Sequence, residues 1–261
     1  MGKRTQKKQL TDYHIHIGQF NKEYYDAHKV FDTIVSAGVG VDSVRYSSTS
    51  SCRYDVELFR IEEEIMYAQQ YSDYRLTVIP YLWFVPKYAE QGIDVRSAMS
   101  SFDYCGIKIH SYAQHWDLEN TAHRKCLDAI FGWADDMKKD VLIHCGVDKC
   151  CLPSRFEQFF GAYSNARIIL AHSRPLDDTI SMLQKYPNVY CDISYTPQDD
   201  VIRLTQTEYK HRILFGTDFP ITHYWAHHLH GDNISLQEQY KRDCQILLKA
   251  GLYSDCSREE I

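Results

Sequence analysis

Short runs of apolar residues, rich in Val, Ile and Tyr, recur along the chain and alternate with longer segments of helical periodicity. Most of the runs are almost continuously apolar, which is typical of parallel strands covered by helices. Eight strands are predicted on this basis. They are Leu10–Ile17, Val41–Ser47, Arg75–Val85, Cys105–Ser111, Val141–Gly146, Ala166–Ser173, Val189–Ser194 and Ile213–Pro220.

The segments between and after these runs predict helices. Their approximate bounds are Tyr24–Ala37, Val56–Tyr71, Val95–Phe102, Thr121–Lys138, Ser154–Tyr163, Leu176–Lys185, Asp199–Lys210 and Ser235–Ala250. Eightfold alternation of strand and helix over about 250 residues predicts an α/β fold, a single (β/α)₈ barrel spanning residues 1–261 with residues 1–9 as a flexible tail. A doubly wound open sheet is the alternative, but it usually has fewer strands and a Gly-rich first turn, which this sequence lacks.

Composition and charge narrow the functional classes. The 261 residues are 44% hydrophobic and 25% charged, which excludes disordered and collagen-like proteins. The net charge of −6 works against non-specific binding to nucleic acid, and no apolar run is long enough to span a membrane. No apolar segment of a signal peptide follows the basic start, so the nine scattered cysteines favour a reduced, cytoplasmic protein. The expected partner is a small-molecule substrate, and a homodimer is compatible with the sequence.

The clearest chemical signal is Asp12-Tyr13-His14-Ile15-His16 in the first predicted strand. Alternate side chains of a strand share a face, so Asp12, His14 and His16 are expected to project together. Two imidazoles separated by one residue can chelate one divalent ion. An H-x-H pair alone is about as often a pair of ordinary histidines, so the metal interpretation depends on residues further along the chain.

Three more potential metal ligands are at the carboxyl ends of later predicted strands, where the catalytic residues of a barrel converge. His144 ends the fifth predicted strand, His172 the sixth and Asp218 the eighth. His144 follows His16 by 128 residues, which is four βα units of 32, and His172 follows after another 28. Histidines and an aspartate in this order predict one metal-centred active site at the carboxyl end of the barrel.

The order H-x-H, Lys, His, His and G-T-D-x-P resembles the amidohydrolase superfamily of metal-dependent barrels. The resemblance is strongest to the branch that contains aminocarboxymuconate-semialdehyde decarboxylase and amidohydrolase-related proteins, and it covers nearly the whole chain. It implies that His14, His16, His144 and Asp218 bind one metal ion, typically zinc. It also implies that His172 positions a water molecule or a substrate oxygen.

The sequence departs from this family pattern in two places. The sixth strand continues as Ala171-His172-Ser173-Arg174, where many relatives have Gly in the turn, so the adjoining pocket is expected to differ. The chain ends at Ile261, where relatives tend to continue through another short helix, which suggests a truncated or divergent C-terminus.

The donor set agrees with the resemblance. Imidazoles and a carboxylate suit Zn²⁺, with Mn, Fe or Co as alternatives, and such an ion lowers the pKa of a water molecule towards about 7. Asp218 can take the proton of this water and return it to the leaving group, and His172 can orient the nucleophile or stabilise an oxyanion. The leading hypothesis is therefore a metal-dependent hydrolase acting on a C–N, C–O or lactone bond of a small, anionic substrate. Non-oxidative decarboxylation on the same scaffold is the second hypothesis, and a metal-free binding or scaffold barrel is the third.

Further residues are candidates for the same pocket. Lys108 can be carbamylated and bridge a second ion, face the substrate as an unmodified cation, or form a structural ion pair; an unmodified lysine and one ion are favoured. His110 shares its face of the strand. The remaining substrate-binding candidates are Arg45, Trp83, Arg174 and Tyr195, of which an arginine would suit a substrate carboxylate. Asp192 is expected to support a ligand or fill the barrel. The cluster after Asp218 is expected to form a lid or a substrate wall; it contains His223, Tyr224, Trp225, His227, His228 and His230.

Overall fold

The computed structural model describes residues 10–53 and 55–249. Within them, one sheet has the strand order β2-β1-β3-β4-β5-β6-β7-β8-β9. The strands are β1 (Leu10–Phe20), β2 (Glu23–Tyr25), β3 (Val41–Ser48), β4 (Thr77–Trp83), β5 (Gly106–Ile109), β6 (Asp140–His144), β7 (Arg167–Ala171), β8 (Val189–Asp192) and β9 (Ile213–Leu214). Only the short β2 is antiparallel to its neighbour, β1; every other neighbouring pair is parallel.

Backbone hydrogen bonds close this sheet into a barrel. The segment that follows β9 lies beside β1, where the Tyr13 N–H donates to the Phe215 carbonyl (2.9 Å) and the Asp218 N–H to the His14 carbonyl (2.8 Å). The His16 N–H donates to the Phe219 carbonyl (2.8 Å). We call residues 13–16 and 215–219 the closing seam. Eight parallel strands therefore form the ring, and the predicted α/β fold, a (β/α)₈ barrel, is confirmed.

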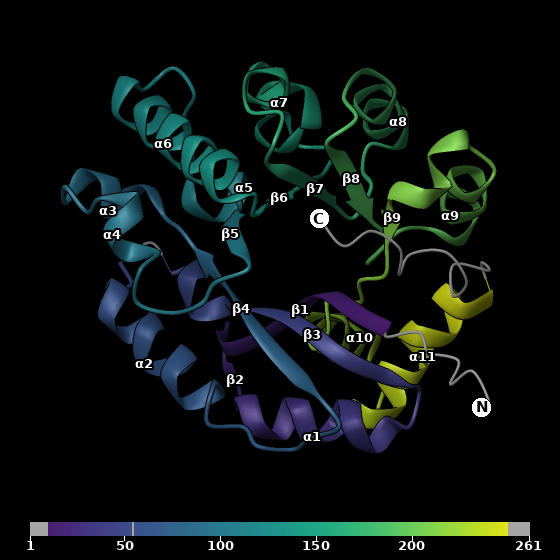
Figure 1. The fold of residues 1–261 in the computed structure, drawn as a ribbon. Coiled ribbons are helices and arrows are strands. Elements are labelled where there is room, and N and C mark those ends of the chain that lie inside the picture. The colour runs from purple at the N-terminus through teal and green to yellow at the C-terminus, as the bar shows by residue number, and fades with distance from the viewer. Residues whose placement is uncertain (1–9, 54, 250–261) are drawn as a thin grey trace, which may run out of the picture.

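Helices surround the ring of strands (Figure 1). They are α1 (Ala27–Ala37), α2 (Leu58–Ala68), α3 (Pro86–Glu90), α4 (Val95–Ala98), α5 (Ser111–Gln114), α6 (Thr121–Met137), α7 (Glu157–Ala162), α8 (Leu176–Lys185), α9 (Gln198–Thr205), α10 (Ile221–His230) and α11 (Leu236–Lys249). Their buried faces pack on the strands to form the main core, and a second apolar cluster fills the barrel interior. In the described part of the chain, none of the helices has the length and apolar character needed to cross a membrane.

Two predicted helices differ from the observed ones. The first was expected from residue 24, but residues 23–25 form β2 and α1 begins after Asp26, whose side chain accepts the Lys29 N–H. Gly38 ends α1 in a left-handed conformation (φ 69°). The helix predicted over residues 95–102 is only the single turn α4.

An irregularity in β1 changes which of its side chains share a face. Asp12 pairs with Val44 and Ile15 with Tyr46, so β1 has one more residue than β3 between these pairs. Such a bulge shifts the alternation of side chains. The expectation that Asp12 lies on the same face as His14 is therefore wrong. The Asp12 carboxylate instead accepts hydrogen bonds from Thr217 and from Tyr240 of α11.

Candidate metal centre and active site

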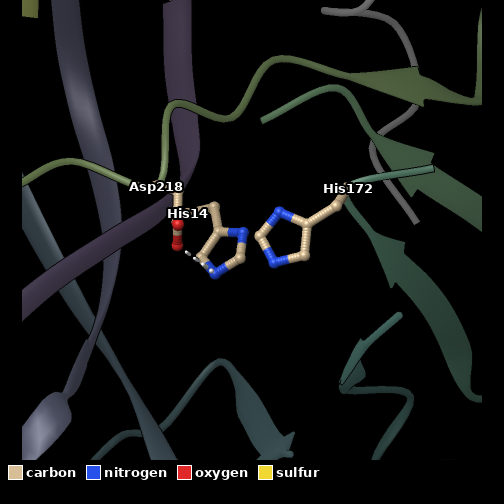
Figure 2. Close-up of side chains that lie close together, drawn as sticks. All are labelled: His14, His172 and Asp218. Carbon is tan, nitrogen blue, oxygen red and sulfur yellow. Dashed lines mark ion pairs between the residues drawn. The ribbon is translucent and has the colours of Figure 1, made fainter. Parts of the chain in front are cut away.

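Side chains from β1 and from the segments that follow β7 and β9 meet at one point in the barrel (Figure 2). His14 and His16 come from β1, and Asp218 follows β9. The Asp218 Oδ1 lies 3.0 Å from His16 Nε2 and 3.3 Å from His14 Nε2. The ring of His172, which follows β7, lies 5.1 Å from the ring of His14. The structure thus brings together residues separated by up to 204 positions in sequence (218 − 14).

The backbone turns sharply at the residues that supply two of these side chains. His172 (φ 68°), Ser173 (φ 47°) and Asp218 (φ 61°) have left-handed conformations. These are uncommon for residues other than glycine and tend to occur at functional sites. The turn at Asp218 is held by the bond from its N–H to the His14 carbonyl. The end of the strand therefore redirects the carboxylate towards the histidines.

Hydrogen bonds on the outer side of the cluster orient three of its imidazoles. In each ring Nδ1 has a partner away from the centre, which leaves Nε2 to face inward. The bonds are His14 Nδ1 to Asp192 Oδ2 (2.8 Å), His16 Nδ1 to Ser47 Oγ (3.1 Å) and His172 Nδ1 to the Ser194 carbonyl (3.1 Å). Since a carboxylate and a carbonyl only accept, His14 and His172 carry a proton on Nδ1 and a lone pair on Nε2.

A close approach of the backbone supports the bond between His14 and Asp192. Gly216 lies against both residues, and a Cβ atom added to it would be 3.1 Å from each of their Cβ atoms. This distance is tighter than ordinary van der Waals contact, so a larger residue would displace one of the two side chains. The glycine of the G-T-D motif thus lets the backbone approach both side chains closely.

His144 enters the cluster through His172. Its Nδ1 lies 3.0 Å from His172 Nε2. Its ring stacks on His110 with 3.6 Å between centroids, and His110 stacks in turn on Trp83 at 5.6 Å. The three rings form a continuous aromatic wall beside the histidine cluster.

The arrangement suits a divalent metal ion. Among the described residues, ligand atoms of His14, His172 and Asp218 all lie within 4.8 Å of one another. His16 contacts Asp218 of this group, and His144 contacts His172. Imidazoles and a carboxylate are ligands that Zn²⁺ and other first-row ions accept. The family resemblance implies that His172 positions water or a substrate oxygen. In the structure, its ligand atom lies together with those of His14 and Asp218.

Electrostatics place these groups in the forms that bind metal. Burial lowers the pKa of His16 to about 4 and that of His172 to about 3, so both rings are neutral at pH 7. Burial works against ionisation of Asp218, but its interactions with His14, His16 and His172 hold its pKa below the usual range. Neutral imidazoles and an ionised carboxylate need lose no proton before an ion binds.

Lys108 lies in the same cluster. It is buried, and its Nζ is 2.8 Å from His14 Nε2 and 5.6 Å from the Trp83 ring. No carboxylate of residues 10–53 or 55–249 is within ion-pair distance of it, which removes the structural ion pair as an explanation within that range. Burial lowers the pKa of this amine.

The sequence matches the Amidohydrolase family over residues 62–260. The chain belongs to the amidohydrolase family. The match contains Lys108, His144, His172 and Asp218, whereas the H-x-H pair of β1 lies before it. Members of this family are generally enzymes, and the superfamily typically binds divalent metal ions.

Solved structures with the same fold share little sequence with this amidohydrolase. A phosphotriesterase homology protein from Escherichia coli, complexed with phosphate in its active site, is 13% identical with a TM-score of 0.55, over 92% of this chain and 95% of that one. N-acetylneuraminate lyase from Mycoplasma synoviae is 10% identical with a TM-score of 0.51, over 93% and 78% of the two chains. No curated protein matches the sequence. At these identities the two structures support the barrel fold alone.

Residues of the histidine cluster line a cavity of about 390 Å³. They are His16, Lys108, His144, His172 and Asp218. The candidates Trp83, His110, Arg174 and Tyr195 line it as well. Five of the six proposed substrate-binding or bridging residues therefore reach this cavity.

Arg45 does not reach it, and its prediction as a pocket residue is wrong. β3 continues to Ser48, so Arg45 is not at the carboxyl end of its strand. It forms an ion pair with Asp140, the first residue of β6, at the opposite end of the barrel.

α10 supplies an apolar wall of the cavity, of which the sequence analysis named only Trp225. Ile221, Trp225 and Leu229 line the cavity at intervals of four residues, which places them on one face of the helix. Of the cluster expected as a lid or wall, Trp225 thus lines the cavity, whereas His228 pairs with Glu23 of β2. The i, i+4 spacing of the apolar residues was the available signal.

Proposed function

We propose that this amidohydrolase is a metal-dependent hydrolase that uses an activated water on a C–N, C–O or lactone bond of a small, anionic substrate. The observation that carries the proposal is the convergence of inward-facing imidazole nitrogens and Asp218 beside a cavity that His16, His172 and Asp218 line. His14, His16, His172 and Asp218 would hold the ion, most simply Zn²⁺, with His144 beside them. When bound, such an ion polarises a substrate oxygen and lowers the pKa of a neighbouring water molecule.

Asp218 is the residue best placed to move a proton. Its Oδ1 is fixed between His14 and His16, and its low pKa keeps it ionised, so it can accept the proton of the attacking water. The same carboxyl then returns this proton to the leaving nitrogen or oxygen. The bond from His172 Nδ1 to the Ser194 carbonyl directs Nε2 of this ring to the reacting centre, where it would serve as a ligand of the ion.

Arg174 supports an anionic substrate. Its guanidinium lies 5.8 Å from the centre of the Tyr195 ring, and both residues line the cavity. The Nε of Arg174 is buried and has no hydrogen-bond partner among the described residues, so it can pair with a substrate carboxylate. The apolar side chains of α10 would cover the rest of a small substrate.

Lys108 favours a second candidate function, non-oxidative decarboxylation. Its Nζ lies in the cavity beside His14, without a carboxylate partner in the described residues. In such a reaction the bond between the substrate and its carboxylate breaks, CO₂ leaves, and the carbon takes its proton from the Lys108 ammonium. A carbamylated Lys108 holding a second ion would instead remove this proton donor.

Metal content is the first test. The protein purified without chelator is expected to hold about one ion per chain, and the His14→Ala/His16→Ala variant to lose it. His211→Ala, which changes an exposed histidine, is the matched control and should keep the ion. Wild-type protein that neither contains an ion nor gains stability on adding one would refute the metal centre.

A substrate panel then separates the two reactions. Carboxylate-bearing amides, esters and lactones are incubated in ¹⁸O-labelled water, and the corresponding acids are assayed for CO₂. Label in the product supports the hydrolase, and CO₂ release without label supports the decarboxylase. Two ions per chain, together with an increase in the mass of Lys108 that corresponds to one CO₂, would support carbamylation.

A further inference from the structure

A second cavity, of about 330 Å³, opens at the amino-terminal ends of β5, β6 and β7, opposite the candidate active site. Its ionisable lining contains four cations and two carboxylates, a net charge of +2. These residues are Arg45, Lys138, Lys139 and Arg167, with Asp103 and Asp140. A concentration of positive charge here contrasts with the net charge of −6 for the whole chain.

Two arginines share one carboxylate at the floor of this cavity. Arg167 Nε and Nη2 donate to the two oxygens of Asp140 (2.7 and 3.0 Å), and Arg45 Nη1 donates to Asp140 Oδ2. Tyr81 donates a further hydrogen bond to the same carboxylate (2.9 Å). Burial opposes ionisation, but the charges of Arg167 and Arg45 hold the pKa of Asp140 below its usual range. One buried carboxylate thus balances one of two guanidinium charges.

The arginines keep donors available to a ligand. Two guanidinium groups offer ten N–H groups, and Asp140 accepts only three of them. The side chains of Arg45 and Arg167 are 18% and 20% exposed, and both line the cavity. Their guanidinium groups also lie 4.4 and 5.3 Å from the centre of the Tyr13 ring, so both pack against the same aromatic side chain.

The lysines at the rim add to this arrangement. Lys138 caps α6 in a left-handed conformation (φ 51°), a position that glycine usually occupies. Lys139 pairs with Asp103 at 3.2 Å, but Asp103 is almost fully exposed, so this pair is weak. Both ammonium groups can therefore contribute to the field at the mouth of the cavity.

This cavity is separate from the candidate active site. A layer of buried side chains in the barrel interior, including Leu142, Ile169 and Leu214, lies between the two ends. A ligand at the amino-terminal end would touch none of the residues that line the first cavity.

We propose that this amino-terminal cavity binds a small oxyanion of charge −1 or −2, such as a phosphate or a dicarboxylate. The guanidinium forks of Arg45 and Arg167 match the oxygens of either group, and the lysines supply additional charge. The bound anion neutralises the excess guanidinium charge, so it stabilises the folded protein. This site goes beyond the proposed hydrolase function and does not depend on it.

The test measures anion binding at constant ionic strength. Thermal unfolding and calorimetric titration are carried out with inorganic phosphate, malonate and chloride, using the His14→Ala/His16→Ala protein to exclude binding at the metal centre. Phosphate or malonate is expected to bind and to raise the melting temperature above that in chloride; whichever binds more tightly identifies the ligand as tetrahedral or dicarboxylate. Equal melting temperatures in all three salts would overturn the proposal.

Variants locate the binding site. Arg45→Met leaves Asp140 paired with Arg167 and Tyr81, so it is expected to fold and to weaken anion binding by at least about tenfold. Arg45→Lys keeps the charge without the fork and should bind with intermediate affinity, which maintains the test if Arg45→Met is unstable. Arg174→Met, at the other end of the barrel, is the matched control and should bind as the parent does. Unchanged binding in both Arg45 variants, or loss of binding in Arg174→Met, would refute the site.

Discussion

Asp243 of α11 provides a direct test of how burial controls ionisation in this protein. Its Oδ2 accepts a hydrogen bond from Thr222 (2.7 Å) and its Oδ1 one from Gln239 (2.7 Å). Burial raises the pKa of this carboxyl from 3.8 to about 7. The charge of Asp218 also raises this pKa, while the two hydrogen bonds and Arg242 lower it. At pH values between 3.8 and about 7, the folded protein therefore holds a proton here that the unfolded chain has released.

The direction of the pH dependence follows from the linkage between proton binding and folding. A carboxyl whose pKa is raised by folding contributes stability at low pH, and this contribution is lost as pH rises towards the folded pKa. Between pH 5 and pH 7 the loss is about 1.36 kcal/mol for each pH unit, or about 2.7 kcal/mol. Because the side chain is half-buried, solvent relaxation reduces the effect, and we expect about 1–3 kcal/mol.

Asp243→Asn removes this titration and can keep both hydrogen bonds, since its Oδ1 accepts from Gln239 and its Nδ2 donates to the Thr222 hydroxyl. Relative to wild type, the variant is expected to be more stable at pH 8 than at pH 5 by about 1–3 kcal/mol. The measurement is the free energy of unfolding in urea at both pH values, with both proteins at the same metal content. Asp199→Asn, an exposed position on α9, is the control. Parallel pH dependence of wild type and Asp243→Asn would refute the reasoning.

Three further predictions concern the metal centre. Asp192→Asn weakens the bond that orients His14 and is expected to lower metal affinity by about 10–100-fold in a chelator competition; unchanged affinity would contradict it. Gly216→Ala adds a Cβ against His14 and Asp192 and should reduce the free energy of unfolding by about 1–3 kcal/mol, whereas Gly132→Ala, with room in a helix, should not reduce it. Asp218→Asn is expected to fold but to lose turnover by at least about a hundredfold, and full activity would exclude its role as the base.

The sequence contained enough information to predict the barrel and the end of it that holds the site. Continuous apolar runs determine strand positions because both faces of a parallel sheet are buried. The strand-end positions of His144, His172 and Asp218 then follow from chain order alone, since the carboxyl ends of all barrel strands share one face. Arg45 is an exception, because its position depends on the length of its strand in the folded protein. β3 continues to Ser48, and Arg45 pairs with Asp140 at the amino-terminal end of the barrel.

Pairing between strands could not be predicted from local pattern. The bulge that separates Asp12 from His14 exists because β1 must pair with β3 on one side and with residues 215–219 on the other. The Nδ1 partners are likewise distant in sequence: Ser47 is in β3, Asp192 ends β8 and Ser194 lies just after β8. Each is at least 22 positions from the histidine it contacts. Such partners have no signature in the sequence around the ligand.

The least regular part of the barrel is also the part where the site is built. β9 pairs with β8 through only two residues, and the chain then departs from strand geometry at Asp218. Left-handed residues other than glycine are each unfavourable by about 1–3 kcal/mol, so neighbouring interactions must stabilise them. Here the Asp218 N–H bonds to the His14 carbonyl, while the Asp218 carboxylate reaches His14 and His16 across the same closing seam. An ion held by these three residues would join both sides of the seam, so the chemistry of the site and the closure of the barrel depend on the same contacts.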